Sequence, residues 1–183
     1  VLQGARARIH PLFVLGAHDA ARDLAATFTE LAERVRHPDH LRLAAMWQTL
    51  WAALEGRFDE AEVLADQLRT RLDVAGHSQV GTIHLVQTFT IRWMRGDLAA
   101  ASPVVGAARH HTDDAFTWRV LHAWIEATTG HPDTALGLLG DRPAEELSAA
   151  DPGYLWTAAV VGAAVTATTV GDAGWARATH DTL

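Results

Sequence analysis

Three amino acids are missing from this chain of 183 residues: cysteine, lysine and asparagine. Without cysteine, the chain can form neither a disulfide framework nor a thiolate metal site. All 15 basic residues are arginine, and the formal net charge is −7. A surface that binds nucleic acid normally carries a basic patch that displaces phosphate counterions. The composition therefore argues against direct binding of nucleic acid.

Long apolar runs are also scarce. Residues 154–170 carry no charge, but they consist mainly of alanine, threonine, valine and glycine. This stretch is short for a bilayer span, which needs about 20 predominantly apolar residues. Residues 1–16 contain arginines and lack the apolar core of a signal peptide. We expect a chain without a membrane segment, located in the cytoplasm.

Residues that usually mark a catalytic or metal site are few. There is no glycine-rich phosphate loop, and no serine lies in a nucleophile motif; the serines are Ser78, Ser102 and Ser148. The closest histidine pairs are His37 with His40 and His110 with His111. A zinc site takes three or four ligands, and the spacing supplies no third one. We predict no catalytic, metal or cofactor-binding residues and no enzymatic activity.

The tripeptide His-Pro-Asp occurs twice, at residues 37–39 and 131–133. J-domain cochaperones use this tripeptide, but they also need a basic helix before it, and this sequence has none there. Proline is tolerated at the first position of a helix, where its missing N–H has no partner to lose. Both tripeptides therefore predict helix starts.

An internal repeat organises the chain. Five glycines are each followed five residues later by an alanine: Gly16/Ala21, Gly56/Ala61, Gly96/Ala101, Gly130/Ala135 and Gly171/Ala176. Glycine can end one helix, and a small alanine allows two helices to approach closely at the corner of a hairpin. We expect one helical-repeat domain over residues 1–183, with a first helix interrupted by Pro11. Further helices are expected near residues 19–36, 39–55, 58–74, 79–95, 97–110, 115–129, 132–149 (broken at 141–143), 153–170 and 172–183.

Side chains that are mostly apolar recur at positions −13, −10, −6 and −2 before these glycines. The sets are Leu43, Met46, Leu50 and Leu54; Ile83, Val86, Thr90 and Met94; Thr117, Val120, Trp124 and Thr128; and Ala158, Val161, Val165 and Thr169. Spacing by three and four places each set on one helical face. A hairpin cannot bury such a face alone, so neighbouring hairpins are expected to stack.

Residues 56–61, Gly-Arg-Phe-Asp-Glu-Ala, resemble the corner of tetratricopeptide repeats, Gly-Asp-Tyr-Asp-Glu-Ala. The other four corners keep the glycine and the alanine. Units near 40 residues, rich in Arg, Ala and Trp, are similar to the C-terminal arrays of large bacterial regulators. These are signal-transduction ATPases, LuxR-type or antibiotic-regulatory transcriptional regulators, and multidomain adenylate cyclases. The resemblance implies an all-α, right-handed solenoid of antiparallel hairpins with four to five repeats, as one piece of a longer chain whose chemistry lies in other domains.

Polar residues collect at positions −11, −8 and −4 of the first helices, and they form our candidate interaction face: Gln48, Thr88, Arg92, Arg119, His122 and Glu126. Two interpretations stay open. The face is a groove that binds a peptide or another domain, or it is a solvated face tied by an Arg92–Glu126 pair. In the last repeat the same three positions hold apolar residues, Val160, Ala163 and Ala167. We expect that helix to be covered by residues beyond Leu183 or by a second copy of the chain.

Two functions fit this sequence. The first is a non-catalytic scaffold of a bacterial signalling or transcriptional regulator, with a protein or peptide as partner, either a domain of the same chain or a separate molecule. The alternative is a sensor that binds a small molecule or short peptide in the concave groove. Enclosed aromatic pockets would favour the sensor, and an open polar face would favour docking. The sequence does not separate which of the seven tryptophans are core and which line a groove.

Overall fold

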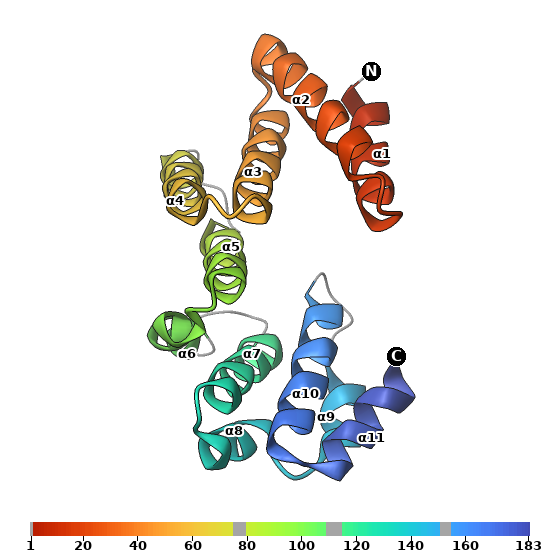
Figure 1. The fold of residues 1–183 in the computed structure, drawn as a ribbon, viewed down its shortest axis with the longest axis vertical. Coiled ribbons are helices and arrows are strands. Elements are labelled where there is room, and N and C mark those ends of the chain that lie inside the picture. Colours follow the sequence, from red (N-terminus) through yellow and green to blue (C-terminus); the bar gives the residue numbers. More distant parts are fainter. Residues whose placement is uncertain (1, 75–79, 109–114, 151–154) are drawn as a thin grey trace. The chain divides into compact units, whose positions relative to one another are not determined.

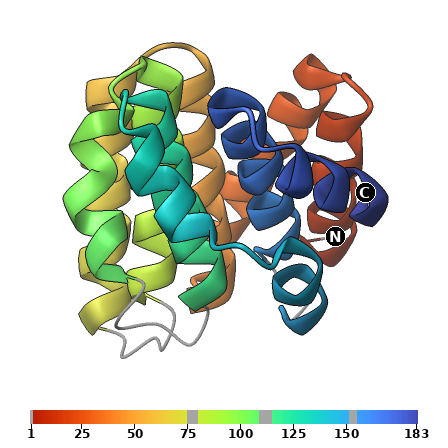
Figure 2. The ribbon, with the colours of Figure 1, turned by 90° about the horizontal axis from the view of Figure 1, so that it is seen from below.

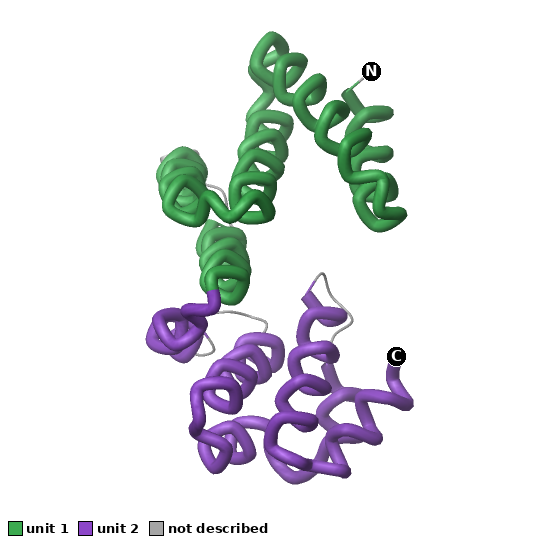
Figure 3. The backbone as a smooth tube through the Cα atoms, in the orientation of Figure 1, with its two compact units in different colours: residues 1–95 green, residues 96–183 purple. Residues whose placement is uncertain are grey.

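The computed structural model describes residues 2–74, 80–108, 115–150 and 155–183. Within these residues every regular element is a helix, which confirms the predicted all-α class. The chain divides into two compact units, residues 1–95 and 96–183 (Figure 3). Each unit has buried apolar clusters of its own.

In unit 1, consecutive helices pack against each other (Figure 1). The helices are α1 Leu2–Val14, α2 His18–Val35, α3 Pro38–Leu54, α4 Phe58–Val74 and α5 Val80–Arg95. Ile9 and Phe28 are fully buried in the cluster shared by α1, α2 and α3. Small residues dominate the cluster of α3, α4 and α5, where Ala61 and Ala65 lie beside Ile91. Alanine at these positions lets the helix backbones approach closely.

Unit 2 is built around α7 and α10, which pack against each other although they are not consecutive. Its helices are the 3₁₀ helix η1 Leu98–Ala101, α6 Ser102–Ala108, α7 Ala115–Thr128, α8 Pro132–Leu139, α9 Pro143–Ala149, α10 Trp156–Val170 and α11 Ala173–Thr182. Helix α10 also packs on α11, and the two lie side by side in both ribbon views (Figure 2). The core contains Val120, Leu139 and Trp175.

The five predicted corners are confirmed by their backbone. Each corner glycine follows a helix and has φ between +76° and +92°, a left-handed conformation that glycine adopts without a steric penalty. Four of the five corner alanines are almost completely buried, namely Ala21, Ala61, Ala101 and Ala135. The fifth, Ala176, is partly buried against the core of unit 2.

Pro38 and Pro132 begin helices, as expected, and Pro143 begins α9 after the predicted break. The predicted interruption at Pro11 is wrong, because α1 runs through it to Val14. The ring removes one backbone donor, yet the Pro11 carbonyl still accepts from the Leu15 amide at 3.0 Å. Ile9, two residues before Pro11, is fully buried in the cluster with α2, and this packing favours the helix despite the missing bond.

The other predicted helices are confirmed where they are described, including the break at residues 141–143 between α8 and α9. The segment expected at 97–110 differs because it begins as the 3₁₀ helix η1. Residues 79, 109–110 and 153–154 of the predicted helices lie outside the described part of the chain.

The last repeat corrects our assignment of the inward face. In α10 the expected core positions Ala158, Val161 and Thr169 are exposed. The set Val160, Ala163 and Ala167, at positions −11, −8 and −4, is buried instead. It packs with side chains of this same unit, such as Leu139 and Trp175, so its cover does not come from beyond Leu183. Helix α10 is apolar on every side, and the pattern of its side chains therefore does not reveal which face packs.

Candidate functional site

The candidate interaction face divides between the two units. Gln48, Thr88 and Arg92 lie on α3 and α5 of unit 1. The other three residues, Arg119, His122 and Glu126, lie on α7 of unit 2. The proposed pair of Arg92 with Glu126 would join the two units, and it stays a prediction.

In unit 1 the face contains an exposed amide and a paired arginine. Gln48 is exposed on α3, and Thr88 is half-buried on α5. The guanidinium Nη2 of Arg92 lies 2.8 Å from Glu62 Oε1 on α4. Arg95 also lies near Glu62, at 3.5 Å between Nη1 and Oε1. The sequence did not identify Glu62 as a partner.

These pairs belong to a row of charges along α4 and α5. Asp59 pairs with Arg95, and Asp66 Oδ1 lies 2.9 Å from His84 Nε2. Along α4 the acidic residues are Asp59, Glu62 and Asp66. Their partners on α5, in the same order, are Arg95, Arg92 and His84, so the partner's residue number falls as that of the acid rises. This order is expected for two antiparallel helices. The row matches the register in which α4 and α5 pack, and Arg92 lies beside the acidic face of α4.

Arg119 caps the C-terminal end of α8 with its guanidinium group. Its Nη1 donates to the carbonyl oxygens of Leu138 at 2.8 Å and Leu139 at 3.2 Å. Its Nη2 lies 2.6 Å from Glu146 Oε2 on α9. The last carbonyls of a helix lack intrahelical donors, and a cation there also interacts favourably with the helix dipole. Arg119 therefore connects α7, α8 and α9, and its guanidinium is directed toward these helices.

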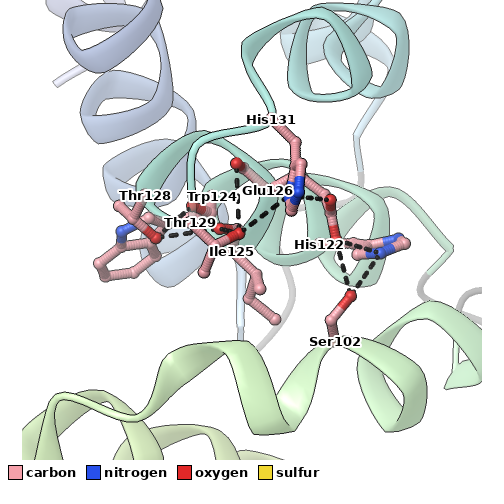
Figure 4. Close-up of polar contacts among 8 residues, drawn as sticks. All are labelled: Ser102, His122, Trp124, Ile125, Glu126, Thr128, Thr129 and His131. Carbon is pink, nitrogen blue, oxygen red and sulfur yellow. Dashed lines mark hydrogen bonds and ion pairs between the residues drawn. The ribbon is translucent and has the colours of Figure 1, made fainter.

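His122 and Glu126 form a hydrogen-bonded cluster with Ser102 (Figure 4). Ser102 Oγ donates to Glu126 Oε1 at 2.7 Å and lies 3.2 Å from His122 Nε2. The same Nε2 lies 3.2 Å from Glu126 Oε1, and the two side chains are 16% and 14% exposed. The second carboxylate oxygen, Oε2, lies 3.1 Å from His131 Nδ1. One half-buried carboxylate thus joins α6, α7 and the turn before α8.

The cluster holds a serine, a histidine and a carboxylate, but its geometry differs from that of a catalytic relay. In a relay, one imidazole nitrogen receives the serine proton while the other contacts the acid. Here Ser102 and Glu126 meet the same nitrogen of His122, and the hydroxyl donates directly to the carboxylate. The arrangement connects helices, and the serine hydroxyl directs its proton toward a carboxylate oxygen and not toward the imidazole.

Sequence reasoning missed Ser102 as a member of this cluster. Ser102 lies 24 residues before Glu126, in the second helix of the preceding hairpin. A polar residue in a second helix that otherwise carries Pro, Val, Gly and Ala was the available signal. Gly106 in the same helix allows close packing, because a Cβ there would meet His122 Cε1 at 3.0 Å.

The structure describes one of the two histidine pairs that the sequence offered as metal ligands. Among described residues no group of three or more His, Asp and Glu side chains is arranged to hold a metal ion. His37 accepts from the Asp39 amide at 3.3 Å, and His40 lies beside it at 5.1 Å between ring centroids. His110 and His111 lie outside the described residues.

None of the described helices has the length and apolar character needed to cross a membrane.

The tryptophans separate into three groups. Trp118, Trp124 and Trp175 are buried, and Trp47, Trp51 and Trp156 are half-buried. Trp93 on α5 is 52% exposed. Most tryptophans therefore pack within a unit, and Trp93 is the candidate for surface contacts.

Two clefts among the described residues lack aromatic lining. One, of about 410 Å³, lies along α4 and is lined by Val63, Asp66, Gln67, Thr70 and Arg71. The other, of about 260 Å³, lies beside α9 and α11 and includes Leu147 and Asp181. Both are open to solvent.

Comparison with known proteins gives no relative from which a function can be transferred. No protein-family model matches the chain, and neither a curated protein nor a solved structure matches it.

Proposed function

We propose that this chain is a non-catalytic scaffold of tetratricopeptide-like hairpins that binds a protein segment on behalf of a larger bacterial regulator. The observation that carries the proposal is the recurring corner, in which a glycine of positive φ ends a helix and a buried alanine follows five residues later. Repetition of one hairpin corner is the signature of helical arrays, whose extended surfaces bind other proteins.

The packing within each unit supports the finer proposal that the hairpins stack as a solenoid. In such arrays the first helix of one hairpin packs on the first helix of the next. The corresponding pairs, α3 with α5 and α7 with α10, are in contact within their units. The open, non-aromatic clefts favour docking over the sensor alternative.

The docking face that we propose is the half in unit 1, around Gln48 and Thr88. Gln48 is exposed on α3, and α3 contacts α5, which carries Thr88 and Arg92. In unit 2 the corresponding side chains already bind other helices. An amide and a hydroxyl can both donate and accept hydrogen bonds, and this suits the backbone of an extended peptide.

The experiment begins with peptides selected from a random library on the full chain. Their affinity is then measured by calorimetry for the wild type, for Gln48→Ala with Thr88→Ala, and for a matched control. The control is Gln3→Ala with Thr27→Ala, the same two residue types exposed on α1 and α2. We expect the first double variant to weaken binding about tenfold or more, a loss of about 1.4 kcal/mol, and the control to leave it within about twofold. Equal effects in the two double variants would contradict the proposed face.

A further inference from the structure

The net charge of the chain resides in unit 2. Residues 96–183 contain eleven aspartates and glutamates against four arginines, which accounts for the whole charge of −7. Residues 1–95 contain eleven carboxylates and eleven arginines, so unit 1 is neutral. A surface with an excess of one sign attracts partners of the opposite sign and repels those of its own. A partner of unit 2 is therefore expected to present basic residues.

The cleft beside α9 and α11 combines apolar surface with one acid. The two helices pack against each other (Figure 1). Each contributes three residues spaced by three and four, Ala144, Leu147 and Ser148 from α9 and Ala178, Asp181 and Thr182 from α11. Such spacing places each set on one face of its helix. The hydroxyls of Ser148 and Thr182 donate to carbonyl oxygens one turn earlier in their own helices, both at 2.7 Å. The cleft therefore offers mainly apolar surface beside the carboxylate of Asp181.

The size of the cleft and the position of its acid indicate what would fit there. Its volume of about 260 Å³ is below the range of about 300–1,000 Å³ that is typical of small-molecule pockets, and it suits a single apolar side chain of a protein. Asp181 lies in the last turn of α11, where a negative charge interacts unfavourably with the helix dipole. Its charge does not stabilise its own helix, whereas an incoming cation would offset it. Arg177 directly precedes Ala178 and so projects about 100° around the helix from that cleft residue.

Helix α1 has the opposite character. It contains no acidic residue, and its two arginines, Arg6 and Arg8, are exposed and form no ion pair with another described residue. Leu15, at the C-terminal end of the helix, is 81% exposed, and Val14 beside it is 68% exposed. The Leu15 amide donates to the Pro11 carbonyl at 3.0 Å, which continues the helical pattern. Leu15 therefore lies about two turns from Arg8 on the same face. An apolar end with a cation two turns away complements an apolar cleft with an acid.

We propose that the cleft between α9 and α11 binds helix α1 of a second copy of this chain, with Leu15 in the cleft and Arg8 facing Asp181. The two surfaces are different, so the contact is heterologous and joins molecules head to tail. Contacts of this kind generate rings or open chains of molecules. The contact is separate from the peptide-binding face proposed around Gln48 and Thr88, which lies on α3 and α5.

Analytical ultracentrifugation of the full chain over a range of concentrations tests this contact. At about 0.1 M salt, where the Debye length is about 10 Å, we expect the weight-average mass to rise with concentration above that of one chain. At about 1 M salt the Debye length falls to about 3 Å, and the rise should shrink markedly. A mass that stays at that of one chain at the lower salt concentration would overturn the proposal.

Two variants separate the two halves of the contact. Arg6→Glu with Arg8→Glu reverses the charge of α1 and leaves the cleft intact. Ala144→Phe fills the cleft from an exposed position on α9 and leaves α1 intact. We expect either variant alone to self-associate about tenfold more weakly than the wild type. An equimolar mixture of the two should form a dimer and no larger species, because one variant supplies the cleft, the other supplies α1, and neither can extend the chain.

The matched control is Ala149→Phe, which replaces an exposed alanine of the same helix outside the lining of the cleft. It should leave self-association within about twofold of the wild type. If Ala144→Phe does not fold, Asp181→Arg takes its place, since an arginine near the C-terminal end of a helix is favourable. Equal weakening by Ala149→Phe would overturn the proposal, and so would a mixture of the two folded variants that stays monomeric.

Discussion

The guanidinium of Arg119 donates to the carbonyl oxygen of Leu138 at 2.8 Å and so caps the C-terminal end of α8 from a neighbouring helix. Our sequence analysis assigned Arg119 to a recognition face because its position repeats with that of other polar residues. In the structure its partners are backbone carbonyls and Glu146, all within unit 2. Substitution of Arg119 should therefore reduce the stability of unit 2.

Arg119→Met should destabilise the protein by about 1–3 kcal/mol, because partly buried acceptors lose their donor while the apolar part of the side chain is kept. Urea denaturation measures this loss. The matched control is Arg177→Met, an exposed arginine on α11, which should change stability by less than about 0.5 kcal/mol. If Arg119→Met is as stable as the wild type, Arg119 is available for recognition as first predicted.

Gly106→Ala should destabilise unit 2, because the new Cβ would lie 3.0 Å from the His122 ring, which is held by Ser102 and Glu126. Overpacking of this kind costs about 1–3 kcal/mol. Gly81→Ala on α5 is the control: its Cβ would meet no atom within 4 Å, and alanine favours a helix over glycine by about 0.5–1 kcal/mol. We expect the melting temperature to fall for Gly106→Ala and to rise for Gly81→Ala. A rise for both variants would show that the His122 ring can move aside at little cost.

Ala101→Leu should destabilise the protein by about 1–3 kcal/mol, since Ala101 is 1% exposed at its corner and a larger side chain would force the helices apart. Its neighbour Ala100 is exposed, so Ala100→Leu should be nearly silent. Chemical denaturation of both variants provides the measurement. A silent Ala101→Leu would remove the packing argument for the repeat at this corner.

Acid should weaken the corner between α3 and α4 through Glu55. A hydrogen bond from Arg57, and the charges of Arg22 and Arg57, outweigh the opposing effect of burial and lower the pKa of Glu55 below its ordinary value. A carboxyl whose pKa is lowered by folding stabilises the protein above its unfolded pKa, and this contribution is lost as the pH falls through the folded pKa.

The unfolding midpoint in urea, measured from neutral to acidic pH, tests this prediction. Glu55→Gln should flatten the acid side of the profile, whereas Glu30→Gln, an exposed carboxylate on α2, should leave the slope unchanged. The effect should also shrink in high salt, because Arg22, Glu55 and Arg57 are accessible to solvent. Identical profiles for the wild type and Glu55→Gln would contradict it.

Much of the fold follows from local chemistry, and for that reason the sequence predicts it well. Gly56 and Gly96 end helices because a left-handed backbone suits a residue without Cβ, and Pro38 and Pro132 begin helices because their missing N–H costs nothing there. Helix bounds and hairpin corners depend on residues that are close together in the sequence. The prediction for Pro11 failed because burial of Ile9 outweighs one lost hydrogen bond.

The partners of the candidate site residues depend on contacts between helices. The spacing of residues along one helix does not specify those contacts. The sequence by itself placed Arg119, His122 and Glu126 on one face of α7, as the helical spacing requires. The tertiary structure alone decided that Arg119 binds the end of α8 and that Ser102 meets Glu126 from a different hairpin. It also decided which side of α10 is buried, since an all-apolar helix fits a core on any face and its neighbours select one. The physical reason is common to these cases: spacing fixes the direction of a side chain around its own helix, whereas its partner depends on which other helix packs there.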